Sequence, residues 1–251
     1  EAARALREVQ RQSQHHPVQA RVQTEALTQK LVAQLLGDGE MCIRLLGTQV
    51  GDRAAAHGLN VAIVALLVGR GLGLGEAELT DLGVGAMLHD IGKLDLPDRV
   101  RHADEGFTMA ETNAYREHVA RGVQRGRTMG LAPGALAVLA QHHEHVDGSG
   151  FPLRPAADKL TLAGRIVAIV NRYDNLCNPA VLARALTPHE AISLLFAQSR
   201  HRFDAAVLGS FIRMMGVYPA GSCVELSDGR HALVIGSNAS RPLKPRVLVH
   251  D

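Results

Sequence analysis

The spacing of apolar residues predicts helices over most of this 251-residue chain. In the first 48 residues, apolar side chains recur at roughly helical intervals, with breaks at Pro17 and at Gly37-Asp38-Gly39. From Asp52 to Gly69, the residues after His57 are apolar on nearly all sides, which is typical of a helix buried among other helices. We therefore expect two or three N-terminal helices followed by a buried one.

Another helix is predicted over 79–90, and its C-terminal end carries His89 and Asp90. Gly92 then breaks the helix, so Lys93 is expected in a loop beside this pair. By the same criteria, further helices are predicted to begin at Thr108, where Glu111 completes a capping box, and to cover 135–145, 160–177, 188–199 and 205–215.

The apolar period changes after Pro219, where alternation replaces the helical pattern. Asp228-Gly229 is typical of a hairpin turn between two short strands, and 246–249 is predicted to form a third strand. The expected fold class is therefore mainly α, with a small C-terminal β appendage. The expected parts are an N-terminal helical segment or linker from a larger regulatory region (1–48), a helical domain (49–216) and a β-rich extension (217–251).

Composition excludes several classes of function. The net charge of +2 is small and no basic block focuses it, so we expect neither nucleic-acid nor membrane-surface binding. The longest strongly apolar run, 61–68, is too short to cross a bilayer. Three distant cysteines support neither a disulfide framework nor a cysteine zinc site, so we expect a cytoplasmic protein. The start at Glu1, without Met or a signal peptide, suggests a piece of a longer chain.

Histidines carry the candidate chemistry. The chain has thirteen, and five fall on predicted helices where they can converge: His57, His89, His118, His142 and His143. A capped helix end explains His89-Asp90 alone, and a core histidine explains His57 alone. Burying all these rings without a common purpose would be costly, so the full set favours a metal site. It suits Mn, Fe or Zn and exceeds the needs of one ion. We expect two ions, roughly 3.5–4 Å apart, bridged by Asp90 and a hydroxide, with Lys93 neutralising a phosphate.

The ordered set of motifs resembles the HD-GYP family of bacterial cyclic di-GMP phosphodiesterases, over about residues 50–215. The resemblance implies a helical HD-type metallohydrolase bundle, a dinuclear or trinuclear Fe or Mn site, and hydrolysis to the linear dinucleotide or GMP. The implied metal ligands are His57, His89, Asp90, His118, His142, His143 and Asn171. The implied catalytic residues are Asp90 and Lys93, and the implied substrate-binding residues are Lys93, Asp147, Gly150, Phe151, Pro152 and Arg184.

The chain departs from the family pattern at several positions. Asn171 stands where the family has an Asp ligand, and we expect Asp174, one turn later, to support a ligand rather than bind metal. An Arg-Pro-Tyr-Arg type segment that holds substrate in many members is replaced by 180–183, Ala-Val-Leu-Ala, with Arg184 as a partial substitute. Phe151 replaces a Tyr, and Arg53 replaces a Glu found in trinuclear members, so we expect two metals.

Two main functions remain open from sequence. The first is a cyclic di-GMP phosphodiesterase with a two-metal site. The alternative is a degenerate module, weakened by Asn171 and the missing cations, that senses a nucleotide or docks a diguanylate cyclase domain through Gly150-Phe151-Pro152. A phosphohydrolase for another nucleotide is a third option, since this scaffold serves several substrates. A homodimer is a further hypothesis.

Overall fold

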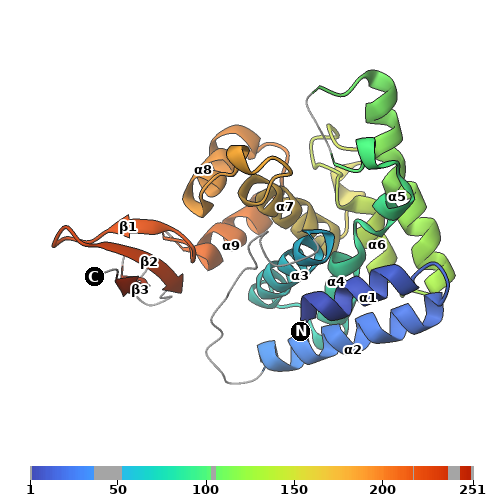
Figure 1. The fold of residues 1–251 in the computed structure, drawn as a ribbon, viewed down its shortest axis with the longest axis horizontal. Coiled ribbons are helices and arrows are strands. Elements are labelled where there is room, and N and C mark those ends of the chain that lie inside the picture. Colours follow the sequence, from blue (N-terminus) through green and yellow to red (C-terminus); the bar gives the residue numbers. More distant parts are fainter. Residues whose placement is uncertain (1, 37–52, 103–105, 217, 237–243, 250–251) are drawn as a thin grey trace.

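The computed structural model describes residues 2–36, 53–102, 106–216, 218–236 and 244–249, and these form a helical body with a small sheet projecting from it (Figure 1). The helices of the body are α1 (Ala2–Gln12), α2 (Pro17–Leu36), α3 (Arg53–Gly71), α4 (Glu76–Leu88), α5 (Met109–Met129), α6 (Pro133–Gln141), α7 (Leu162–Cys177), α8 (Pro188–Ser199) and α9 (Ala205–Met215). Short 3₁₀ turns lie at η1 (Ile91–Asp95), η2 (Asp98–Val100), η3 (Ala157–Lys159) and η4 (Leu182–Arg184). The predicted mainly α fold class is confirmed.

Helix α3 lies at the centre of the body and packs against α1, α4, α7 and α9. Most of its side chains are buried, as the unbroken apolar pattern predicted. By length and composition α3 could cross a membrane, but 67% of the relevant window is buried inside the fold. A mostly buried apolar helix of this kind is the expected core of a helical domain.

The first two helices belong to this same body. They run side by side (Figure 1), and α1 packs on α3 while α2 packs on α4 and α5. Leu6, Val9, Val32 and Leu35 are buried in the common hydrophobic core. The first 36 residues therefore help to enclose the core rather than extending away from it. The predicted boundary at 48 and the expected helical residues around Leu45 fall outside the described residues.

The predicted helix boundaries are correct for α8 and α9 and close for the others, and the capping box of Thr108 and Glu111 starts α5 as expected. The prediction of one helix over 135–145 is wrong at its C-terminal end. Helix α6 ends at Gln141, whose carbonyl accepts from the Glu144 N–H at 2.9 Å. The chain then turns, and the N–H of Phe151 donates to the carbonyl of His143 at 3.1 Å.

The sheet confirms the predicted β appendage. Its strands, β1 (Cys223–Glu225), β2 (His231–Gly236) and β3 (Arg246–Val249), are antiparallel in the order β1-β2-β3. The hairpin turn is closed by the N–H of Leu226, which donates to the carbonyl of Arg230, and by Gly229 with a φ of 84°. A positive φ is readily adopted only by glycine, which explains the Asp-Gly turn.

Candidate active site

Three histidines reach the centre of the helical body in the same way. His89 follows the last turn of α4, His118 lies in α5, and His142 follows the last turn of α6. In each, ring atom Nδ1 lies close to the backbone carbonyl three residues earlier, at Ala86 (2.7 Å), Tyr115 (2.5 Å) and Leu139 (2.8 Å). A carbonyl only accepts, so each Nδ1 carries the proton and each Nε2 presents a lone pair. The helix backbone thus sets the tautomer that binds metals.

His57 completes a second pair of imidazoles. Its Nδ1 lies 2.6 Å from Asp174 Oδ2, and its Nε2 lies 3.2 Å from His89 Nε2. The Nε2 atoms of His118 and His142 are likewise 3.2 Å apart. With every Nδ1 protonated, these short distances bring lone pairs together with no proton between them. Such an arrangement is repulsive unless a cation lies nearby, so both pairs fit a bound metal ion.

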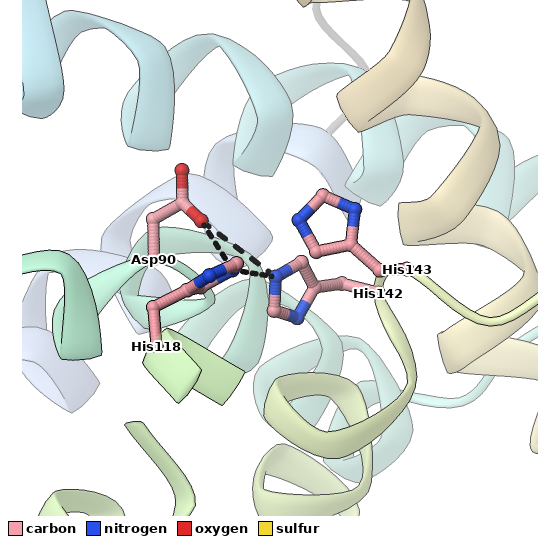
Figure 2. Close-up of side chains that lie close together, drawn as sticks. All are labelled: Asp90, His118, His142 and His143. Atoms are coloured by element: carbon pink, nitrogen blue, oxygen red, sulfur yellow. Dashed lines mark hydrogen bonds and ion pairs between the residues drawn. The ribbon is translucent and has the colours of Figure 1, made fainter. Parts of the chain in front are cut away.

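Asp90 lies between the two pairs. Its Oδ1 is 3.5 Å from His118 Nε2 and 3.6 Å from His142 Nε2, and Figure 2 shows these side chains pointing toward one another. Its other oxygen, Oδ2, is 3.5 Å from His89 Nε2 and 3.7 Å from His57 Nε2. One carboxylate therefore offers one oxygen to each pair, which is the role expected of a bridging ligand.

Two buried polar atoms support the same interpretation. Asp90 Oδ1 and His143 Nε2 are both buried without a hydrogen-bond partner. His143 groups with Asp90, His118 and His142, whose possible ligand atoms all lie within 4.8 Å of one another, and His57, His89 and Asp90 form a second such group. Unpartnered buried polar atoms are rare in folded proteins, and these two fit a site that a bound cation would complete. Neutral imidazoles with one carboxylate suit Mn, Fe or Zn.

The protonation states of these side chains suit a cation. Burial lowers the pKa of His89 and His118 to about 3, although Asp90 acts in the opposite direction. Burial also holds the pKa of His143 well below its usual range, so all three rings are neutral near pH 7. For Asp90, burial raises the pKa, but Lys93 and the surrounding histidines outweigh it, so the pKa lies well below the usual range. The carboxylate is ionised.

Lys93 is held against Asp90 by the 3₁₀ turn η1. Its Nζ donates to Asp90 Oδ2 at 2.6 Å and lies 5.2 Å from the centre of the Tyr115 ring. This turn lies directly on α5: a Cβ on Gly92 would come within 2.0 Å of the His118 carbonyl oxygen and 2.5 Å of the Gly122 nitrogen. Only glycine allows this approach, which brings Lys93 and His118 to the same site.

Asn171 and Asp174 lie on α7 facing His57. The amide oxygen of Asn171 is 3.1 Å from His57 Nε2 and accepts from Asn175 Nδ2 at 2.7 Å. Asp174 receives His57 Nδ1 on Oδ2, and its Oδ1 accepts from the side chains of Asn60 at 3.1 Å and Asn178 at 3.0 Å. Asn171 therefore stands on the metal-facing side of His57, and Asp174 supports that ring from behind.

The loop after α6 forms one wall of the site. Phe151 stacks on His143, with ring centres 4.4 Å apart and planes inclined by 22°. The buried carboxylate of Glu144 fixes the loop by accepting the backbone N–H groups of Leu153 at 2.7 Å and Arg154 at 3.1 Å. Only glycine fits at position 150, because a Cβ there would lie 2.5 Å from the His143 carbonyl oxygen and 2.5 Å from the His145 nitrogen. Pro152 follows Phe151 through a cis peptide bond.

A cleft of about 400 Å³ opens beside these ligands. It is lined by Arg53, Lys93, His102, Tyr115, His142, His143, His145, Phe151, Ala168, Asn171, Arg172, Asn175, Pro179, Ala180, Ser199, Arg202 and Phe203. A smaller cavity of about 60 Å³ is lined by His57 and Asp90 and shares Arg53 and Lys93 with the larger cleft. The lining of the larger cleft includes four Arg or Lys residues and no carboxylate among the described residues, so it suits an anion.

The structure brings the predicted metal ligands and Lys93 together, and Phe151 also lines the cleft, but the other four predicted substrate-binding residues do not line it: Asp147, Gly150, Pro152 and Arg184. Arg184 is exposed in η4, and Asp147 is exposed with its Oδ1 accepting from the Ser149 N–H; neither lines the cleft. Sequence analysis missed Arg172 and Arg202, which do line it. Arg172 follows Asn171 directly but belongs to no motif of the family, and Arg202 lies outside the motifs, so nothing in the sequence indicated this position.

Comparisons with known proteins agree with this architecture. The sequence profile of the HD domain matches residues 40–207. A cyclic di-GMP phosphodiesterase of Pseudomonas aeruginosa is 28% identical over 229 residues, which are 89% of this chain and 54% of that protein. The cyclic di-GMP phosphodiesterase response regulator RpfG of Xanthomonas campestris is 33% identical over 153 residues, or 60% of this chain and 40% of that one.

A solved HDG"Y"P protein from Bdellovibrio bacteriovorus shares the fold, with a TM-score of 0.69 at 15% identity, covering 82% of this chain and 67% of that one. The chain spans about half the length of the Pseudomonas relative and less of the Xanthomonas relative.

Proposed function

This chain belongs to the HD-domain family, in its HD-GYP group, and on that premise we propose that it is a metal-dependent phosphodiesterase that hydrolyses cyclic di-GMP. The observation that carries the proposal is the position of Asp90, whose two oxygens each face a different pair of histidine lone pairs. A shared carboxylate between two ligand sets is the arrangement expected of two-metal phosphodiester hydrolysis.

The proposed ligand sets follow from the two groups around Asp90. His118, His142 and His143 would hold one ion, and His57, His89 and the Asn171 amide oxygen the other. We favour Fe or Mn, with Zn as a third option, because imidazole and carboxylate ligands suit all three. Two such ions would lower the pKa of bound water and stabilise charge on the phosphoryl group.

The other residues of the site act on the substrate. Lys93 is partly buried beside Asp90 and lines the cleft, so its ammonium group can stabilise charge that develops on the scissile phosphate. Phe151 presents an aromatic ring that supports stacking by a nucleobase. The burial of the imidazoles keeps bulk water away from the ligand atoms, which strengthens these electrostatic interactions.

The direct test is turnover by the purified chain after reconstitution with Mn²⁺ or Fe²⁺, with the linear dinucleotide and GMP separated by chromatography. The Asp90→Asn variant, purified in parallel, controls for contaminating enzymes. We expect product from the wild-type protein and a loss of at least about 10³-fold in the variant, comparable to removal of a principal group that stabilises the transition state. If the wild-type protein holds two ions per chain and makes no product, the proposal is wrong.

Asn171 supports a second candidate function, a degenerate module that binds metal or nucleotide without turnover. Its neutral amide oxygen is a weaker ligand than a carboxylate and is already used by Asn175. In that case the Asn171→Asp variant should gain hydrolysis that the wild-type protein lacks. A healthy wild-type rate that this substitution leaves unchanged would remove the main support for the degenerate module.

Substrate range and partners are further parts of the proposal. A panel of cyclic dinucleotides and nucleoside phosphates would distinguish cyclic di-GMP from the other substrates that this scaffold can serve. The loop at Gly150-Phe151-Pro152, in which Pro152 is exposed, is our proposed docking point for a diguanylate cyclase domain. Analytical ultracentrifugation would test the homodimer hypothesis.

A further inference from the structure

Two arginines that no motif accounts for line the cleft. Arg172 is on α7, directly after Asn171, and Arg202 is in the turn between α8 and α9. Both line the cleft, and both are exposed to solvent. They share this lining with His145 and Phe203.

Neither arginine forms an ion pair within the part of the chain that the structure describes. Arg165, two turns earlier on α7, shows the usual behaviour: its Nη1 donates to Asp204 Oδ2 at 2.8 Å. Arg172 and Arg202 instead bring two like charges together without a carboxylate in the cleft lining. Like charges repel, so such a pair is unfavourable unless an anion lies between them. A phosphate accepts the paired N–H donors of arginine better than most groups do.

A second positive region lies beside the metal ligands. Lys93 and Arg53 line the same cleft and also the smaller cavity that contains Asp90. Arg53 is held in place by its Nη2, which donates to the Asn178 carbonyl at 2.7 Å. The cleft therefore has one cationic region at the proposed site of hydrolysis and another at Arg172 and Arg202. A ligand with one phosphate would use only one of them.

We propose that Arg172 and Arg202 bind the second phosphate of a cyclic dinucleotide, the one that is not being cleaved, and thereby select substrates that carry two phosphodiesters. This inference rests on the proposed function for the identity of the ligand. It also explains how this chain could bind substrate phosphates although residues 180–183 contain no cation; Ala180 lines the cleft but is uncharged. The two arginines reach the cleft from α7 and from the α8–α9 turn instead.

The test compares substrates with two and with one phosphodiester. Arg172→Ala and Arg202→Ala should each raise KM for cyclic di-GMP by about 10-fold, as expected for loss of one charge-assisted contact, and change kcat by less than about twofold. For bis(p-nitrophenyl) phosphate, which has a single phosphodiester, kcat/KM should stay within about twofold of wild type. Arg213→Ala, an exposed arginine on α9 outside the cleft lining, is the matched control and should change neither substrate.

Equal losses for both substrates, or no change in either, would overturn the inference. Arg172→Lys should recover part of the affinity, because it restores charge without the paired donors. Circular dichroism would verify that each variant is folded.

Equilibrium binding of cyclic di-GMP to metal-free protein separates this inference from the proposed function. If the reconstituted wild-type protein shows no turnover while both metal-free variants bind cyclic di-GMP more weakly than metal-free wild type, the phosphate site is supported and the phosphodiesterase is refuted. Turnover with unchanged binding and KM in both variants would refute the phosphate site alone.

Discussion

Replacing Asp174 with Asn should weaken metal binding although Asp174 touches no proposed metal position. Its carboxylate serves three neighbours, receiving His57 Nδ1 on Oδ2 and the side-chain amides of Asn60 and Asn178 on Oδ1. A carboxylate can satisfy all three because both of its oxygens accept. An amide has one accepting oxygen and one donating NH₂ group, so it cannot accept hydrogen bonds from both His57 and the two asparagine amides.

Each orientation of the new amide has a defined consequence. If its oxygen accepts from His57, its NH₂ group faces the amide donors of Asn60 and Asn178, which loses buried hydrogen bonds and lowers the unfolding free energy by about 1–3 kcal/mol. If the oxygen instead accepts from those donors, the NH₂ group donates to His57 Nδ1. The ring proton then moves to Nε2, the atom that faces His89, and His57 can no longer bind a metal there.

The expected result is a loss of about 10–100-fold in metal affinity, or roughly 1.4–2.8 kcal/mol, at the ion held by His57. Competition titration with Mn²⁺ and a fluorescent chelator measures it, and urea unfolding of metal-free protein measures the stability term. Asp158→Asn, an exposed carboxylate paired only at the surface with Lys159, is the control and should change neither quantity. Wild-type affinity and stability in the Asp174→Asn variant would refute the reasoning.

Three further predictions concern stability and the loop. Gly92→Ala should destabilise the protein by more than about 3 kcal/mol, because the new Cβ would overlap the α5 backbone. Gly122→Ala is the control: its Cβ meets nothing closer than 3.5 Å, so it should be neutral or stabilise the helix by up to about 1 kcal/mol. Equal melting temperatures for the two variants would contradict this. Glu144→Gln should lower the unfolding free energy by about 1.5–3 kcal/mol and raise KM, because one acceptor for the loop N–H groups is lost. Chemical denaturation measures the unfolding free energy and steady-state kinetics measure KM. If neither quantity changes, this carboxylate does not have the proposed role. Burial lowers the pKa of His89 and His118 from 6.5 to about 3, so between these pH values the unfolded chain binds more protons than the folded one. The unfolding free energy of the metal-free protein should therefore fall by on the order of 1 kcal/mol per histidine for each pH unit below 6.5. Equal urea midpoints at pH 7 and pH 5 would contradict this.

The fold was largely predictable because its signals are local. Capping at Thr108, Pro188 at the start of α8 and the unbroken apolar pattern of α3 each depend on neighbouring residues alone. The end of α6 was not predictable from periodicity, because His142 and His143 continue the helical spacing of that segment. The turn there is fixed by hydrogen bonds to a loop whose path depends on the folded site.

The candidate site also has a part that could be predicted from sequence and a part that could not. The imidazoles were recognisable because their motifs occur in a fixed order. Asp174, one turn after Asn171, was expected to support a ligand, but the sequence did not identify His57 as that ligand. The cationic end of the cleft was not recognisable, because Arg172 and Arg202 lie 30 residues apart on different elements and meet only in the folded protein. Arg184 had the expected position in sequence but does not line this cleft.

The central claim is that Asp90 joins two metal sites that hydrolyse cyclic di-GMP. Metal content and turnover measured on one preparation of the reconstituted protein test it most directly. We predict two divalent ions per chain and formation of the linear dinucleotide, with both the second ion and the activity lost in Asp90→Asn. Full occupancy by two ions without product, or undiminished activity in that variant, would contradict the account.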